Sequence, residues 1–296
     1  MSTMPQETVA GSDRLAMTLP RLAEKKRLGE PIVMITAYDF PSGRIAEEAG
    51  VDVVLVGDSA GDVVLGYGST VPVKLEEMLM LAAAARRGLR APLLVADLPF
   101  GSYEASDEKA VESAQRFVKE AGADAVKLEG GGTTQVSRVA AIVAAGIPVM
   151  GHVGLTPQSA TALGGRRAQG RTAERALAVG REARALEAAG CFAIVFEAIP
   201  AAVAAELTAL LSIPVIGIGA GAGTDGQVLV LHDMLGVYPG QALRHSKQYA
   251  DLHGQMLSAI AEYAEDVRSG HFPRAENTFS IAPDELEAFR QQLGDV

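Results

Sequence analysis

The sequence predicts an α/β fold: one (βα)₈ TIM barrel with an N-terminal capping helix and a C-terminal helical extension. From Pro31 onward, short β-branched apolar runs alternate with longer amphipathic stretches, as in βα units around a parallel sheet. The runs are continuously apolar, so both faces of each strand are expected to be covered. Eight runs can be counted, which favours a closed barrel over a doubly wound sheet.

The elements are expected in the following order. The strands cover Ile32 to Ala37, Val53 to Gly57, Leu93 to Asp97, Ala125 to Leu128, Val149 to Val153, Ala193 to Glu197, Val215 to Ile218 and Val228 to Leu231. Glycines that would end a helix before the next strand stand at Gly50, Gly88, Gly122, Gly146 and Gly190. Further helices are expected at Leu19 to Leu28, Gln248 to Arg268 and Pro283 to Gln292.

These elements divide the chain into an N-terminal segment with its capping helix (1–30), the catalytic barrel (31–240) and a helical extension of the same domain (241–296). Length does not demand two domains, because α/β barrels reach this size as one unit. Terminal additions of this kind either pack against a neighbouring subunit or stay solvated.

Composition favours small-molecule chemistry. The formal net charge of −10, without any Lys/Arg cluster, disfavours binding to nucleic acid or to anionic membranes. The chain shows neither a signal-peptide pattern nor an apolar stretch long enough to span a bilayer. The lone cysteine, Cys191, cannot form an internal disulfide and is interpreted as a buried thiol. A cytoplasmic location is therefore expected.

Ionisable residues stand where the strands end, which is where barrels carry their active sites. Asp58, Asp97 and Glu129 follow or end three successive strands, and His152 and Glu197 stand at the ends of the next two. Carboxylates buried together without a countercharge would be protonated or cost several kcal/mol, whereas Mg²⁺ accepts oxygen ligands directly. A metal site is the favoured interpretation of the first three residues. A loop-capping or solvent-facing acid is the alternative for each one alone.

Lys127 and Glu129 are two residues apart on one strand, so their side chains should share the barrel-interior face. Lys127 could bind a substrate carboxylate, form a simple salt bridge or serve as a Schiff-base lysine. Glu197 ends a very apolar run, which suits a general base; a pair with an arginine is the alternative. His152 is expected to orient substrate or a carboxylate rather than bind metal.

The stretch Gly217 to Gly223 superficially suggests a dinucleotide site. A lone glycine-rich stretch is a weak signal, and no acidic residue about twenty positions further on closes a second strand. Close backbone approach at the barrel mouth is the better interpretation.

The strand-end motifs are similar to those of the ketopantoate hydroxymethyltransferases, also called 3-methyl-2-oxobutanoate hydroxymethyltransferases, a family of the phosphoenolpyruvate/pyruvate barrel superfamily. The resemblance spans most of the chain. It includes the segments Ile35 to Asp39, Val56 to Ser59, Ser69 to Val73, Asp97 to Phe100, Ala123 to Gly131, Gly151 to Ser159 and Gly217 to Gly221.

The resemblance implies one Mg²⁺ per subunit on Asp58, Asp97 and Glu129, keto acid contacts from Ser59 and Lys127, and Glu197 as the base. We also expect Asp58, Asp97 and His152 to lie against the substrate. It implies hydroxymethyl transfer from 5,10-methylenetetrahydrofolate to 3-methyl-2-oxobutanoate, which gives 2-dehydropantoate for pantothenate and coenzyme A synthesis. A Lewis acid that stabilises the enolate, formed when a base removes the C3 proton, agrees with that chemistry. A homo-oligomer, a decamer in this family, is implied as well.

Three stretches depart from the family pattern. Met78 to Leu81 lacks a Tyr-His pair, Arg166-Arg167 replaces Tyr-Lys after Gly165, and Arg244 to Lys247 differs from the usual Phe-Val-Lys approach. None is a predicted metal ligand, so the departures bear on the folate-side contacts and the subunit interface. They would permit a divergent paralogue with another acceptor.

Two other functions compete with this one. A Mg²⁺-dependent 2-oxo acid lyase or mutase of the isocitrate lyase and phosphoenolpyruvate mutase type would use a similar barrel, but its cysteine-bearing gating loop is absent from the sequence. An inactive barrel that serves as a scaffold is the second. The intact set of strand-end carboxylates and Lys127 argues against it.

Overall fold

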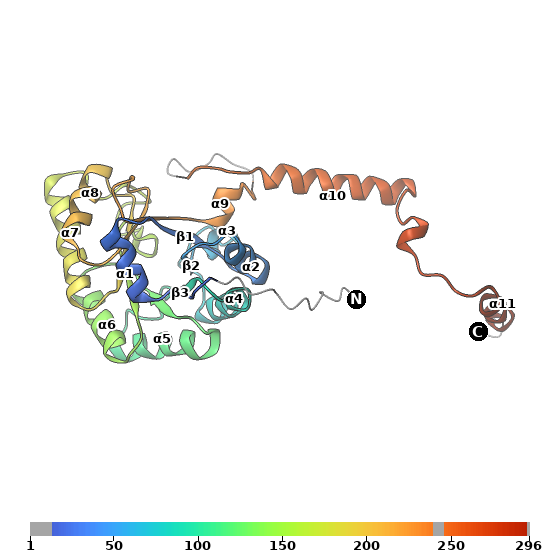
Figure 1. Cartoon of the computed structure of the whole chain (residues 1–296), viewed down its shortest axis with the longest axis horizontal. Helices are drawn as coiled ribbons and strands as arrows, with labels where there is room; N and C mark the ends of the chain where they lie inside the picture. Colours follow the sequence, from blue (N-terminus) through green and yellow to red (C-terminus); the bar gives the residue numbers. More distant parts are fainter. Residues whose placement is uncertain (1–13, 239–245, 295–296) are drawn as a thin grey trace.

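The computed structural model describes residues 14–238 and 246–294. Eight parallel strands close into a barrel in the order β1 to β8, with helices around its outside (Figure 1). The predicted fold class is therefore confirmed. The strands are β1 (Ile32–Thr36), β2 (Val53–Val56), β3 (Leu93–Asp97), β4 (Ala125–Lys127), β5 (Val149–Gly154), β6 (Ala193–Glu197), β7 (Val215–Ile218) and β8 (Gly226–Leu229).

The last strand begins two residues earlier than the sequence predicts. Gly226 pairs with Ile32 of β1, and a Cβ added at Gly226 would lie 2.4 Å from the Ile32 carbonyl oxygen. The pairing therefore requires glycine, a residue that an apolar-run criterion excludes from a strand. Leu231, expected to end the strand, instead begins a short helix whose first N–H donates to Thr36 Oγ1 at 2.9 Å.

The described helices comprise those between strands and three outside the repeat. They are α1 (Leu19–Leu28), α2 (Phe40–Glu48), α3 (Ala60–Val63), α4 (Leu75–Gly88), α5 (Asp107–Ala121), α6 (Thr133–Ala144), α7 (Ala173–Ala188), α8 (Ala201–Leu210), α9 (Leu231–Leu235), α10 (Leu252–Ser269) and α11 (Pro283–Leu293), with 3₁₀ turns at Pro157–Ser159 and Ala275–Asn277. Among the described residues, no helix is long and apolar enough to cross a membrane.

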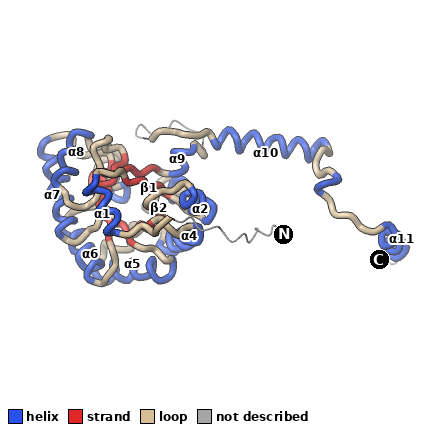
Figure 2. Tube along the Cα trace, viewed as in Figure 1, coloured by secondary structure: helices blue, strands red, loops and turns tan. Residues whose placement is uncertain are grey.

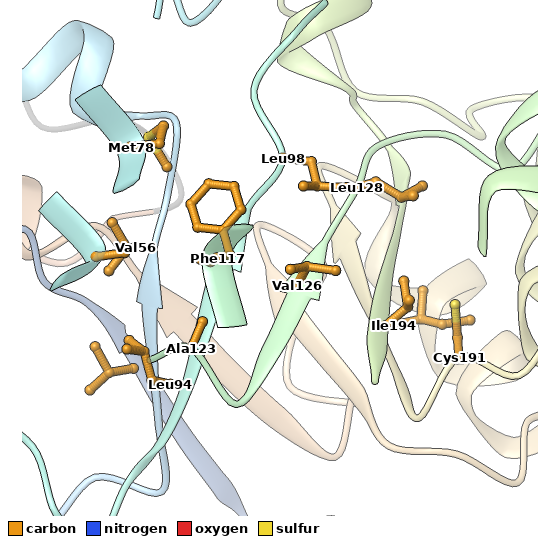
Figure 3. Close-up of a cluster of buried hydrophobic side chains, with 14 of the residues drawn as sticks. Val56, Met78, Leu94, Leu98, Phe117, Ala123, Val126, Leu128, Cys191 and Ile194 are labelled. Atoms are coloured by element: carbon orange, nitrogen blue, oxygen red, sulfur yellow. The ribbon is translucent and has the colours of Figure 1, made fainter. Parts of the chain in front are cut away.

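Two apolar layers hold the barrel together. The inner layer fills the barrel with side chains such as Met34, Val95 and Ile216, and Leu22 of α1 belongs to it. This contact confirms α1 as a capping helix. The outer layer lies between strands and helices, where Leu98, Phe117, Leu128 and Cys191 are buried (Figure 3). Leu128 thus packs on the side opposite its neighbours Lys127 and Glu129, and Cys191 is the buried thiol predicted.

Four of the five predicted helix-ending glycines adopt left-handed backbone where a helix ends; Gly122, for example, is the C-cap of α5 with φ of 68°. The prediction for Gly88 was wrong. Gly88 is the last residue of α4, and a Cβ there would lie 2.6 Å from the Arg44 amide nitrogen of α2. Its lack of a side chain serves helix packing rather than a turn.

The C-terminal extension leads away from the barrel (Figures 1 and 2). Its long helix begins at Leu252 rather than Gln248, because the Asp251 side chain caps it by accepting from the Gly254 N–H at 3.1 Å. Along α10 the larger apolar side chains are about half exposed or more: Met256, Leu257, Ile260, Tyr263 and Val267. Gly240, the predicted end of the barrel segment, and part of the departure at Arg244 to Lys247 lie outside the described residues.

Candidate active site

All seven residues predicted for the site line one cavity of about 1060 Å³ at the carboxyl ends of the strands. Asp97 and Glu197 end β3 and β6, and His152 lies within β5. The others follow or end β2 and β4, and they are Asp58, Ser59, Lys127 and Glu129. The sequence therefore identified one physical site, because the carboxyl ends of parallel strands meet at one end of the barrel.

Asp97 is the centre of the acidic cluster. Its Oδ2 accepts the Asp58 backbone N–H at 3.0 Å, and Lys127 Nζ lies 2.9 Å from its Oδ1 in an ion pair. Strand register explains the pair, since Asp97 of β3 is the direct partner of Lys127 of β4. Both side chains are at most 5% exposed, so each charge needs the other.

Gln158 organises the carboxylates, and the sequence reasoning missed it. Its Nε2 donates to Asp58 Oδ2 at 2.8 Å and to the Leu98 carbonyl at 3.0 Å, and its backbone N–H donates to Glu129 Oε2 at 2.9 Å. Tyr103 donates its hydroxyl proton to Gln158 Oε1 at 2.6 Å. Because an amide can donate and accept at once, one neutral side chain satisfies groups on the loops after β2 and β3, while the Gln158 backbone reaches Glu129 after β4.

His152 bridges Lys127 and Glu197. Its Nδ1 is 3.2 Å from Lys127 Nζ, and its Nε2 is 3.3 Å from Glu197 Oε2. Burial, followed by the Lys127 charge, lowers the pKa of His152, so the imidazole is neutral at pH 7. An ammonium group can only donate, so Nδ1 accepts and the proton sits on Nε2, directed at Glu197. The expected role of His152 in orienting a carboxylate stays a prediction, for which this 3.3 Å separation supplies the proximity.

The site is short of positive charge. Burial and the neighbouring Asp97 raise the pKa of Asp58 to about 7. Burial and Asp58 raise the pKa of Glu129 well above its usual range. Burial alone would lower the pKa of Lys127, but the surrounding carboxylates raise it above its ordinary value. One lysine therefore does not neutralise the carboxylates around it, and a cation would be attracted to this cluster.

The donor atoms suit a hard cation, although they do not form a finished cage. Asp97 Oδ1 is buried, and the Lys127 ammonium at 2.9 Å is its charged partner, so a cation bound at this oxygen would share it with Lys127. Within residues 14–238 and 246–294, no three His, Cys, Asp or Glu side chains already converge as a metal site. Mg²⁺ commonly takes only one or two protein carboxylates and completes its shell with water and substrate, so such a site need not be preformed.

Ser59 lies at the mouth of β2 as the first residue of the α3 turn. Its Oγ is 2.9 Å from the Tyr38 hydroxyl, which is buried under the site after β1. Burial raises the pKa of Tyr38 above its ordinary range, so the phenol keeps its proton. The contact holds Ser59 Oγ in position, and either hydroxyl can be its donor. Tyr38 lies within the family motif Ile35 to Asp39, but the sequence analysis does not single it out as a site residue.

The turn after Glu197 is conformationally costly. Ala198 has φ of 51°, the left-handed region that costs a residue with a Cβ about 1–2 kcal/mol. Its N–H donates to the Ile218 carbonyl at 2.9 Å, and its carbonyl accepts from the Gln169 N–H at 2.9 Å. These two hydrogen bonds hold the turn, and with it the backbone of Glu197. Strained backbone of this kind clusters at functional sites.

The glycine-rich stretch after β7 brings its backbone close to α8. Gly221 lies at the cavity wall with φ of 80°, and a Cβ there would be 2.4 Å from the Ala201 side chain. This agrees with the predicted close backbone approach at the barrel mouth.

Two of the departing stretches fall in different surroundings. In Met78 to Leu81 only Met80 is exposed, and none of the four lines the cavity. Arg166 and Arg167 do line it, and Arg166 Nη2 is 2.5 Å from Asp62 Oδ2 across the mouth.

Comparison with known proteins decides the family. The sequence model of one protein family, the ketopantoate hydroxymethyltransferases, matches residues 16–275 of this chain. The chain belongs to this family. A 3-methyl-2-oxobutanoate hydroxymethyltransferase of Carboxydothermus hydrogenoformans is 53% identical over 92% of this chain and 98% of its own length. An Arabidopsis thaliana relative, 3-methyl-2-oxobutanoate hydroxymethyltransferase 1, mitochondrial, is 47% identical over 99% of this chain and 88% of its own. The chain is thus an enzyme of the hydroxymethyltransferase family.

Solved structures agree on the fold. A phosphonopyruvate hydrolase superposes with a TM-score of 0.58 at 13% identity, covering 94% of this chain and 97% of that one. A 2,3-dimethylmalate lyase gives a TM-score of 0.57 at 15% identity, with 93% and 91% covered. These likenesses show a shared barrel alone. The lyase or mutase alternative is set aside because the family match and the relatives near 50% identity point to hydroxymethyl transfer.

Proposed function

We propose that this enzyme transfers a hydroxymethyl group from 5,10-methylenetetrahydrofolate to 3-methyl-2-oxobutanoate and releases 2-dehydropantoate for pantothenate and coenzyme A synthesis. One observation carries the proposal: seven side chains expected for that reaction line a single cavity in a chain of this family. The cytoplasmic location expected from the sequence stays a prediction.

Asp58, Asp97 and Glu129 would hold Mg²⁺. Three buried carboxyl groups lie around a single lysine, and carboxylate oxygens are ligands that a hard cation prefers. When bound, the ion supplies Lewis-acid stabilisation of negative charge on the keto acid oxygens.

The chain's own groups account for the remaining steps. Lys127 lies at the buried end of the cavity, where its ammonium can bind the substrate carboxylate, and the Ser59 hydroxyl is held in position by Tyr38. Glu197 would take the C3 proton of the keto acid. The neutral His152, with Nε2 3.3 Å from Glu197, would orient that carboxylate without neutralising it.

Room for a second, larger substrate supports the folate donor. The cavity of about 1060 Å³ is at the upper end of the range for whole drug-sized ligands, so the small keto acid leaves most of it empty. Arg166 and Arg167 also line this cavity and bring to it the positive charge that the anionic tail of a folate would need.

A product assay tests this function. We expect 2-dehydropantoate when the chelated protein receives both substrates and Mg²⁺, and none without Mg²⁺. Failure with metal present would refute the proposal. In a second assay Glu197→Gln should still bind the keto acid but exchange its C3 proton for deuterium about 10²-fold more slowly. Exchange at the wild-type rate would contradict the assignment of the base.

We also propose a homo-oligomer, with the apolar face of α10 against another copy. Met256, Leu257, Ile260 and Val267 recur at helical spacing and lie 48–62% exposed, an unusual state for one face of a helix. Leu257→Asp with Ile260→Asp should lower the mass measured by light scattering, and Glu262→Gln on the same helix is the control. An unchanged mass would exclude this face as the contact; the decamer remains a family-based expectation.

A further inference from the structure

The cavity has a second wall that the proposed chemistry does not use. The acidic side chains follow β2 to β6, whereas β7, β8 and β1 complete the circle. On that side the cavity is lined by Ile218, Gly219 and Val230, and by a few polar groups. The keto acid site occupies the acidic side, so the one-carbon donor must lie against this second wall to reach it.

Most polar groups of the second wall already have partners. The Gln227 amide donates to the Gly221 carbonyl at 2.9 Å and to Thr224 Oγ1 at 2.8 Å. The Asp233 carboxylate accepts from the Tyr238 hydroxyl. The Gln227 and Asp233 side chains therefore make hydrogen bonds within the wall itself.

His232 differs from these neighbours. It is the second residue of α9, it lines the cavity, and its Nδ1 is buried without a hydrogen-bond partner among the described residues. A buried polar atom left in this state costs about 1–3 kcal/mol, and natural proteins rarely leave one unless a ligand or water completes it.

The ring of His232 is held in place. It packs on the Tyr38 ring with centroids 5.4 Å apart, and the N–H of the preceding Leu231 is anchored on Thr36 Oγ1. Tyr38 in turn contacts Ser59 through its hydroxyl. His232 is thus one side chain away from the residue expected to touch the keto acid, and a ligand bound by it would lie beside that substrate.

Burial lowers the pKa of His232, although nearby Asp39 opposes the shift. At neutral pH the ring is therefore uncharged and offers one N–H donor and one lone pair. The polar edge of a reduced pteridine, with its amide and amino groups, is complementary to that combination. A carboxylate or phosphate would be better served by a cation.

We propose that His232 is a hydrogen-bonding residue for the one-carbon donor and contacts its pteridine ring on the wall opposite the acidic cluster. This inference rests on the proposed function. It assigns the donor to the β8–β1 side of the cavity and gives His232 no part in removing the C3 proton of the keto acid.

Two reactions separate these roles. Deuterium exchange at C3 of 3-methyl-2-oxobutanoate without folate reports the keto acid site alone, whereas 2-dehydropantoate formation requires the donor as well. We would measure both, together with the Kd of tetrahydrofolate in the presence of keto acid. The variants are His232→Phe, which keeps a ring on Tyr38, and His232→Gln, which keeps a donor and an acceptor. His271→Asn, at an exposed histidine in the extension, is the control.

For His232→Phe we expect exchange within about twofold of wild type, with kcat/KM for the donor lowered and the Kd of tetrahydrofolate raised at least about tenfold. His232→Gln should recover part of both, and it serves as the test if the phenylalanine variant does not fold. Wild-type transfer and folate binding in both variants would overturn the inference, and so would a parallel loss of exchange and transfer. If the wild-type enzyme makes no 2-dehydropantoate, the proposed function itself fails.

Discussion

Gln158 offers the sharpest test of how the site is held together. Gln158→Ala removes three buried side-chain hydrogen bonds, which join Gln158 to Asp58, the Leu98 carbonyl and the Tyr103 hydroxyl. Each group left without a partner costs about 1–3 kcal/mol, but water can enter the vacated space and recover part of it. The Tyr103 hydroxyl also lies 3.4 Å from the Glu129 carbonyl, which reduces its loss.

We therefore expect Gln158→Ala to lower the free energy of unfolding by about 2–4 kcal/mol and to weaken Mg²⁺ binding, since Asp58 loses its positioning bond. Urea unfolding followed by circular dichroism measures the first effect, and calorimetric titration with Mg²⁺ measures the second. Gln169→Ala is the matched control, because among the described residues the side-chain amide of Gln169 bonds the Arg167 carbonyl alone. A midpoint for Gln158→Ala within error of wild type would refute the view that this amide stabilises the carboxylates.

Other perturbations have equally definite outcomes. Lys127→Met leaves buried carboxylates unpaired and should destabilise the Mg²⁺-free enzyme by about 3–5 kcal/mol in thermal unfolding. Unchanged stability would show that the ion pair of Lys127 with Asp97 does not stabilise the fold. The folded pKa of Asp58, about 7, lies above its unfolded value, so protonation favours the fold and the chelated enzyme should lose stability as pH rises from about 4 to about 7. Added Mg²⁺ should restore the melting temperature at pH 8. A melting temperature of the chelated enzyme that does not change with pH would contradict this prediction. Gly43→Ala places a Cβ 2.5 Å from the Ala85 carbonyl and should cost about 1–3 kcal/mol on urea unfolding, unless α2 and α4 can separate. Burial raises the pKa of Cys191 to about 12, so this thiol should resist alkylation until the chain unfolds, and rapid labelling of the native protein would show the core to be open.

The barrel and the acidic half of the site could be predicted because each depends on a local pattern with one structural outcome. A buried strand appears in the sequence as an apolar run, and a charged residue at its carboxyl end lies at the barrel mouth. Asp58, Asp97, Glu129 and Glu197 were found on that logic. Lys127, the last residue of β4, and Leu128 directly after it show this, since the first lines the cavity and the second packs against the helices.

The residues that were missed act through tertiary contacts. Gln158 is neutral and sits in a 3₁₀ turn, and its four partners come from parts of the chain 29–100 residues away. Nothing local distinguishes it from a surface glutamine. The prediction for Gly88 was wrong for the same reason. Only glycine fits there because α2, about forty-five residues earlier in the chain, packs against its Cα.

Charge explains the division of labour within the cavity. If all ionised, Asp58, Asp97, Glu129 and Glu197 would bring four negative charges against one positive charge on Lys127, in surroundings that penalise net charge. A bound divalent cation would remove most of that excess and would lower the repulsion that an anionic keto acid meets on entering. On the proposed function, metal binding would therefore precede substrate binding and would leave one carboxylate to accept a proton. Glu197 fits that part, because its side chain is 18% exposed while those of Asp97 and Glu129 are at most 5% exposed.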